Sequence, residues 1–316
     1  MAVASDPGSA LVSTLARPAT RASRLRARRE ARFGYAMISL AVLFVTVFTG
    51  LPILASFGLS FFSWDVISDP KFIGLENYTR MAEDTAVLRS FKTTILMAVS
   101  VVVLQLGLGL GLAVLVNQRR SNAARTFFRT AFYLPLLAST AAVSIFMGYL
   151  FDYKFGLVNY YLELVGLSKV PWLTSEFGAF ATIVMVAVWQ QVGFTFVLFV
   201  AALMSVPKEV LEAASIDGAK PWATLVRIKV PLISPTILFA AVVAFINAMQ
   251  LFDQPYIMTK GGPGTATTTT TIVMYQSAFQ NLQFGYGSAI SIILLLMILA
   301  VTGLQFLAAR KLVFYQ

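Results

Sequence analysis

The chain has 316 residues, of which 58% are hydrophobic and only 12% are charged, and its mean hydropathy is +0.78. A soluble domain is about 45–50% apolar and about 25% charged, so this composition excludes an ordinary water-soluble enzyme. Cysteine and histidine are both absent, which excludes disulfide frameworks, Cys/His zinc sites, thiol nucleophiles and a Ser-His-Asp triad within the chain.

Six long runs without a charged residue follow one another along the chain. Each is at least as long as the ~20 residues that a helix needs to cross a bilayer, and only a helix satisfies its own backbone over such a run. Several stretches are apolar on all faces, unlike the alternating strands of a membrane β-barrel. The sequence therefore predicts an all-α integral membrane protein with six transmembrane helices, at residues 33–64, 93–118, 130–151, 177–207, 230–252 and 285–309.

The basic residues are unevenly distributed between the loops. Seventeen of the 24 lysines and arginines precede the first run, lie between the second and third or the fourth and fifth, or follow the last. By the positive-inside rule, both termini are predicted to be cytoplasmic. The net charge of +10 is therefore interpreted as a topology signal, not as a nucleic-acid footprint. Residues 1–32 are predicted to be a disordered basic cytoplasmic tail, either solvated or touching anionic lipid.

Several kinds of chemistry have no support in the sequence. We find no phosphate-binding loop, no paired carboxylates in a run and no ionisable residue in the middle of one. No catalytic residue, metal site or cofactor is therefore assigned to this chain. The threonines at 267–271 are predicted to form an extended approach to the last helix.

The segment 205–235, between the fourth and fifth runs, is long, amphipathic and cytoplasmic in this topology. It contains the sequence Glu212-Ala213-Ala214-Ser215-Ile216-Asp217-Gly218-Ala219. Gly218 can take the left-handed conformation that ends a helix, and Asp217 can cap the next one. Small alanines allow another backbone to approach. The segment is therefore predicted to be a helix, a turn and a second helix.

The order Glu-Ala-Ala-x-x-Asp-Gly-Ala, followed by Ile228-x-Val230-Pro231, resembles the EAA loop of permease subunits of bacterial ABC importers. Residues 72–78, 128–135 and 259–263 resemble the carbohydrate branch of that family, the maltose/glycerol-phosphate type. The resemblance covers residues 33–316 and implies the type I ABC importer permease fold in the bacterial inner (plasma) membrane.

This resemblance implies a division of labour. Two permease subunits, here expected to form a heterodimer, make the pathway, two cytoplasmic ATPases bind ATP and Mg²⁺ and drive it, and an extracellular binding protein delivers the solute. The short helix of the EAA loop docks on the ATPase. The residues carried over to this coupling role are Glu212, Ala213, Ala214, Asp217, Gly218 and Ala219.

Other functions remain open at this point. Permeases for glycerol phosphate, amino acids or polyamines are alternatives within the family, and a self-contained carrier or channel, or a membrane scaffold, is an alternative outside it. The absence of ionisable residues in the runs argues against a self-contained carrier, because such a chain has no driving force of its own.

Amides and an aromatic ring in the fourth and fifth runs are predicted to line the solute pathway. Asn247, Gln250 and Gln254 are spaced i, i+3 and i+7, which puts them on one face of a continuous helix, with Asp253 at its edge. Amide groups suit a neutral polyol, whose hydroxyls both donate and accept hydrogen bonds; the alternative is that they connect neighbouring helices. The predicted pathway residues are Gln190, Gly193, Phe194, Asn247, Gln250, Asp253 and Gln254.

Overall fold

The computed structural model describes residues 21–117 and 122–313, and the chain forms two compact units, residues 1–55 and 56–316. The described part of the first unit is helical: α1 (Arg21–Val45), the π-helical turn η2 (Thr46–Gly50) and the start of α2 (Leu51–Leu59). Residues 21–32, expected to belong to a disordered tail, are therefore helical, because alanine and arginine are strong helix formers. Residues 1–20 of that predicted tail lie outside the described residues.

The second unit consists of helices and one short β-ribbon. The ribbon pairs β1 (Phe62–Ser63) antiparallel with β2 (Lys71–Phe72). The helical elements are α3 (Glu76–Glu83), α4 (Thr85–Asn117), α5 (Asn122–Tyr133), η3 (Leu134–Leu137), α6 (Thr140–Leu150), α7 (Leu157–Leu164), α8 (Glu176–Met204), α9 (Lys208–Ile216), α10 (Pro221–Thr224), η4 (Leu225–Lys229), α11 (Val230–Leu232), α12 (Ser234–Met249), α13 (Asp253–Thr259), α14 (Thr270–Tyr275), η5 (Gln276–Gln280) and α15 (Phe284–Leu312).

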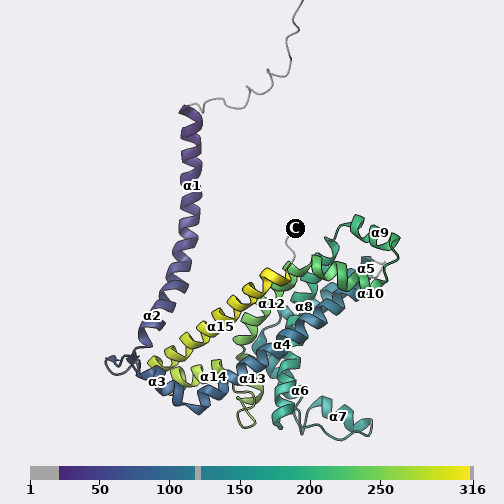
Figure 1. The fold of residues 1–316 in the computed structure, drawn as a ribbon. Helices are drawn as coiled ribbons and strands as arrows, with labels where there is room; N and C mark the ends of the chain where they lie inside the picture. The colour runs from purple at the N-terminus through teal and green to yellow at the C-terminus, as the bar shows by residue number, and fades with distance from the viewer. Residues whose placement is uncertain (1–20, 118–121, 314–316) are drawn as a thin grey trace, which may run out of the picture. The chain divides into compact units, whose positions relative to one another are not determined.

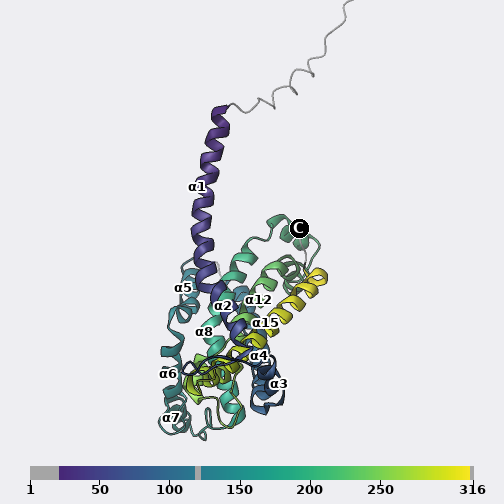
Figure 2. The same ribbon diagram turned by 90° about the vertical axis from the view of Figure 1, so that its left-hand side faces the viewer.

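The core of the second unit lies where α4, α8, α12 and α15 pack together. Ala98, Ala187, Ala244 and Ala248 are all fully or almost fully buried there. In lipid, helices gain from close van der Waals contact and not from leaving water, so small side chains favour this packing. Within this unit, Figure 1 shows α5, α9, α10 and the end of α15 at one end of the bundle and α3 and α7 at the other. Figure 2, in a second view, also shows α5 apart from α3 and α7.

The third predicted helix, 130–151, is not continuous. Residues Thr126–Leu137 and Thr140–Leu150 form two helical pieces bent by 96°. The prediction of one helix is wrong because Pro135, which has no amide hydrogen to donate, lies in the short 3-10 helix η3, and Ala138 and Ser139 after it have ψ angles of 144° and 128°, outside the helical region. The side-chain amide of Gln190 donates to the carbonyl of Ala138 at the bend (3.2 Å) and so satisfies a group that the break leaves free.

The fifth predicted helix is also broken, between α12 and α13. Gln250 is the C-cap of α12, and the carbonyl of Leu251 accepts hydrogen bonds from the hydroxyls of Thr269 (3.0 Å) and Thr271 (2.6 Å). The threonine run is thus only partly extended, because α14 begins at Thr270. The buried hydroxyls of this run donate to a backbone carbonyl that the helix break leaves without a partner. The uninterrupted apolar run at 230–252 gives no sign of the break.

Among the described residues, five helices are long and apolar enough to cross a membrane. Counting the bent pair as one span raises the number to six. The five are Arg32–Leu59, Thr85–Asn117, Glu176–Met204, Ser234–Thr259 and Phe284–Lys311, where Ser234–Thr259 takes α12 and α13 together across their break.

Candidate functional site

A polar pocket of about 350 Å³ lies where the two helix breaks meet α8. It is lined by Leu136, Thr140, Gln190, Gln191, Asn247, Gln250, Leu251, Phe252, Asp253 and Gln254. Five of the seven residues predicted for the pathway are therefore brought together. Among the described residues of the lining, Asp253 is the only charged side chain, and the amides supply both hydrogen-bond donors and acceptors.

The breaks, not helical periodicity, gather these residues. Because α12 ends before Gln250 and α13 begins at Asp253, the interpretation of Asn247, Gln250 and Gln254 as one face of a continuous helix is wrong. The chain turns between the two helices and brings Gln250, Phe252 and Asp253 to the same hollow. The amide spacing predicted residues that do line the pocket, but the reason given for it, one face of a continuous helix, is wrong.

Gln190 and Gln254 form a buried bridge in the pocket wall. The amide of Gln254 donates to the side-chain oxygen of Gln190 (3.2 Å), and both side chains are at most 3% exposed. Gln190 also donates to the carbonyl of Ala138 and lies 3.4 Å from the hydroxyl of Thr140. The bridge thus connects α8, α13 and the bend before α6, and these two amides hold the pocket in shape.

Asn247, Gln250 and Asp253 differ from that bridge. Within residues 21–117 and 122–313, their side chains form no hydrogen bond. Polar groups that line a hollow without an internal partner are available to water or to a solute. These three side chains therefore have hydrogen-bonding groups free to contact whatever occupies the pocket.

Gly193 and Phe194 do not line this pocket. Gly193 is buried where α8 crosses α5: a Cβ added there would collide with the carbonyl oxygen of Phe132 and lie 2.9 Å from the Cα of Tyr133. The absence of a side chain at Gly193 allows close helix packing and does not leave a gap for solute. Phe194 is half-buried on α8, outside the pocket lining.

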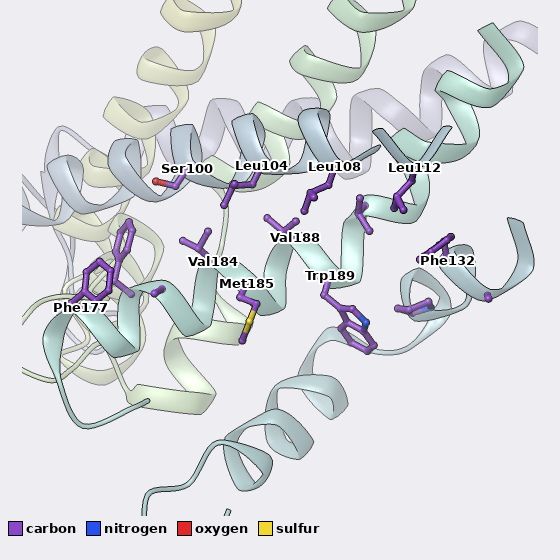
Figure 3. Close-up of a pocket in the computed structure, with 15 residues that line it drawn as sticks. Ser100, Leu104, Leu108, Leu112, Phe132, Phe177, Val184, Met185, Val188 and Trp189 are labelled. Carbon is purple, nitrogen blue, oxygen red and sulfur yellow. The ribbon is translucent and has the colours of Figure 1, made fainter. Parts of the chain in front are cut away.

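A second cavity, of about 650 Å³, lies between α4, α8 and α5 and is almost entirely apolar. Figure 3 shows Leu104 and Leu108 of α4 and Val188 of α8 pointing toward one another across it. Such a lining suits hydrocarbon and offers few partners for hydroxyl groups.

The segment between α8 and α12 has the predicted helix, turn and helix. Helix α9 ends in a Schellman motif: the amide of Ala219 donates to the carbonyl of Ala214 (3.0 Å), and that of Gly218 to the carbonyl of Ser215 (3.1 Å). Gly218 has φ +71°, as this motif requires. The capping prediction for Asp217 is wrong, because Asp217 is the C-cap of α9 and Lys220 is the N-cap of α10.

The exposed side of this loop differs from the prediction in two ways. Ala214 is only 7% exposed, so it packs inside the chain and is not open to a partner, whereas Glu212, Ala213, Asp217, Gly218 and Ala219 are exposed. Two large apolar side chains were missed: Ile216 is 86% exposed and Trp222 is 74% exposed. Large apolar residues within a short polar motif were the sequence signal for them.

A hollow of about 870 Å³ separates this loop from the ends of α4 and α8. Its lining includes Asn117, Leu203, Leu211, Ser215 and Lys229. Beside this hollow the loop contacts the bundle, because Leu211 packs against the buried cluster to which Ala113 of α4 and Leu203 of α8 belong. Among the described residues, no group of three or more acidic side chains could hold a metal ion.

The chain is a membrane subunit of a known class of transporter. Residues 105–313 match the family of binding-protein-dependent transport system inner membrane components, and the chain belongs to this family of ABC transporter permeases.

Individual relatives align over most of their length. The trehalose/maltose transport system permease protein MalF of Thermococcus litoralis is 34% identical over 87% of this chain and 92% of that protein. The lactose transport system permease protein LacF of Rhizobium radiobacter is 31% identical over 88% and 94%. A chain in the crystal structure of a bacterial alginate ABC transporter, bound to an alginate-loaded periplasmic protein, has the same fold. Its TM-score is 0.79 at 21% identity, over 90% of this chain and 96% of that one.

Proposed function

We propose that this chain is a transmembrane subunit of an ATP-driven importer of neutral saccharides. In this proposal it crosses the bacterial inner (plasma) membrane six times with both termini in the cytoplasm, and a second permease supplies the other half of the pathway. Family membership supports the transport role. The names of the trehalose/maltose and lactose relatives support a saccharide as the solute.

The exposed loop at 205–235 carries the coupling part of the proposal. Ile216, next to Asp217 in the sequence, and Trp222, which lines the same hollow as Ser215 and Ala219, present large apolar surfaces at the end of the bundle where the C-terminal end of α15 also lies. Exposed apolar groups within a polar rim are typical of a protein contact. The proposed partner is one of two cytoplasmic ATPases, which binds ATP and Mg²⁺. This chain itself holds no cofactor and has no catalytic role.

The polar pocket carries the solute part of the proposal. Asn247, Gln250 and Asp253 offer donors and acceptors to hydroxyl groups, and Phe252 offers a ring face to the C–H side of a sugar. No cationic side chain lines the pocket among the described residues, so the one charged group that an anionic solute would meet there is the carboxylate of Asp253, which repels it. An extracellular binding protein is proposed to deliver the solute. Residues 33–316 would form the permease domain, and residues 1–32 a basic cytoplasmic extension.

Two measurements on the purified complex test this function. Replacing Ile216 or Trp222 with Asp should prevent co-purification of the ATPase, while Val226→Asp, a matched exposed apolar position in η4, should have a smaller effect. The ATPase rate is then measured with the binding protein and maltose, trehalose, lactose, glycerol 3-phosphate or galacturonate in turn. Stimulation by a neutral sugar alone supports the proposal. Stimulation by glycerol 3-phosphate alone would favour the alternative solute class.

A further inference from the structure

Six aromatic rings form a continuous stripe across α13, α14, η5, the start of α15 and the loop after β1. The members are Phe252, Tyr256, Tyr275, Phe279, Phe284 and Trp64. Each ring lies within 6.0 Å of its neighbour, centroid to centroid, and the closest pair, Phe252 and Tyr256, is stacked at 4.9 Å. The stripe joins segments that lie far apart in the sequence.

One end of the stripe opens into the polar pocket. Phe252 lines that pocket together with Gln250 and Asp253. Phe252 and Gln250 also line an adjoining hollow of about 390 Å³, and Tyr275 and Phe279 line the same hollow. The other end is Trp64, whose carbonyl accepts a hydrogen bond from the amide of Phe284 (3.0 Å). The stripe therefore leads from the loop after β1 to the pocket.

The rings are only partly covered. Phe279 is 61% exposed, and Tyr256, Tyr275, Phe284 and Trp64 are half-buried. Polar groups accompany them: the amide of Gln280 donates to the hydroxyl of Tyr256 (3.3 Å), and Gln250 stands at the inner end. Rings alone would suit a lipid chain. Rings with amides and phenolic hydroxyls suit a ligand that is apolar on its faces and polar at its edges.

We propose that this stripe is a guide on which a saccharide moves from the outer surface to the polar pocket. The C–H face of a sugar ring stacks on the aromatic faces, and its hydroxyls meet the amides beside them. Because neighbouring centroids lie within 6.0 Å, the sugar passes from ring to ring without leaving an aromatic surface. The inference rests on the proposed saccharide function and adds a site outside the pocket.

Phe279 is the residue to test, because it is the most exposed ring of the stripe. The full complex is reconstituted in proteoliposomes with the binding protein, and the uptake of maltose, trehalose and lactose is measured. We expect Phe279→Ala to slow uptake of the transported sugar by about two- to tenfold, as expected for one lost aromatic contact. Phe279→Trp should retain the rate of the parent. The control Phe155→Ala removes an 87% exposed ring that lies outside the stripe and should have no effect.

Subunit assembly and basal ATPase activity are measured on the same variants. Loss of the second permease from purified Phe279→Ala would identify the stripe as a subunit contact and overturn the inference, as would unchanged uptake by this variant. Equal slowing by Phe279→Ala and Phe155→Ala would also overturn it. If the parent takes up none of the three sugars, the proposed saccharide function fails first, and the inference fails with it.

Discussion

Gly193 sets how closely α8 approaches the backbone at the end of α5. A methyl group there would collide with the carbonyl of Phe132, and backbone atoms cannot move aside as a flexible side chain can. The crossing also brings Phe132 onto Phe196, whose rings meet edge to face at 5.4 Å. One glycine thus determines how the broken third helix is held against the bundle.

We therefore expect Gly193→Ala to destabilise the protein by about 1–3 kcal/mol, the usual cost of overpacking a well-filled contact. Gly107→Ala is the matched control, because it also lies in a long apolar helix and nothing lies within 4 Å of the added carbon. Thermal unfolding of the purified protein in detergent measures both. Equal melting temperatures for the two variants would contradict the packing role of Gly193.

The Gln190–Gln254 bridge allows a second test at the scale of single residues. Replacing either amide with Leu leaves the other buried without its partner, which costs about 1–3 kcal/mol. We expect the double variant to cost clearly less than the sum of the two single variants, with a coupling of about 0.5–1.5 kcal/mol measured in the same unfolding assay. Gln191→Leu, a neighbouring amide of the same pocket, should show no coupling to Gln254. Additive losses for Gln190 and Gln254 would contradict the bridge.

Among the elements, the turn after α9 depends on one backbone conformation. Gly218 has φ +71° with nothing within 4 Å of an added Cβ, so a substitution there is limited by the backbone and not by space. A β-branched residue is strained in that conformation, whereas asparagine tolerates it. Substitutions at Gly218 therefore test backbone strain separately from steric clash.

We predict that Gly218→Val uncouples ATP hydrolysis from transport, because the turn that presents Ile216 and Trp222 is altered. Gly218→Asn should retain most of the coupling. Gly166→Val, at φ +81° in another loop and equally open, is the control for backbone strain outside the loop at 205–235. The ratio of solute imported to ATP hydrolysed is measured for each. A Gly218→Val variant with the ratio of the parent would contradict the assignment of the loop.

The elements also explain what the sequence could and could not predict. Long apolar runs predicted α4, α8 and α15 because backbone satisfaction in lipid leaves a helix as the only choice. The breaks near Pro135 and Gln250 were missed because side chains distant in sequence satisfy them, Gln190 in one case and Thr269 and Thr271 in the other. The pocket exists only because of these breaks. Its residue types were predictable from the sequence, but its geometry was not.

For the whole molecule, the distribution of basic residues predicts which end of the bundle faces the cytoplasm. The chain contains no cysteine, so a single one can be introduced as a label. We expect Lys154→Cys to react with a membrane-impermeant maleimide in right-side-out vesicles, and Lys208→Cys only in inside-out vesicles. Both side chains are exposed. The reverse labelling pattern would contradict the proposed orientation.

In the proposed importer, the energy for transport comes from a partner ATPase and not from this chain. The full complex is placed in proteoliposomes with the saccharide-loaded binding protein outside, and uptake of the labelled sugar is followed. We predict uptake only with ATP inside and no change when proton and sodium gradients are abolished. Uptake without ATP, driven by either gradient, would contradict it.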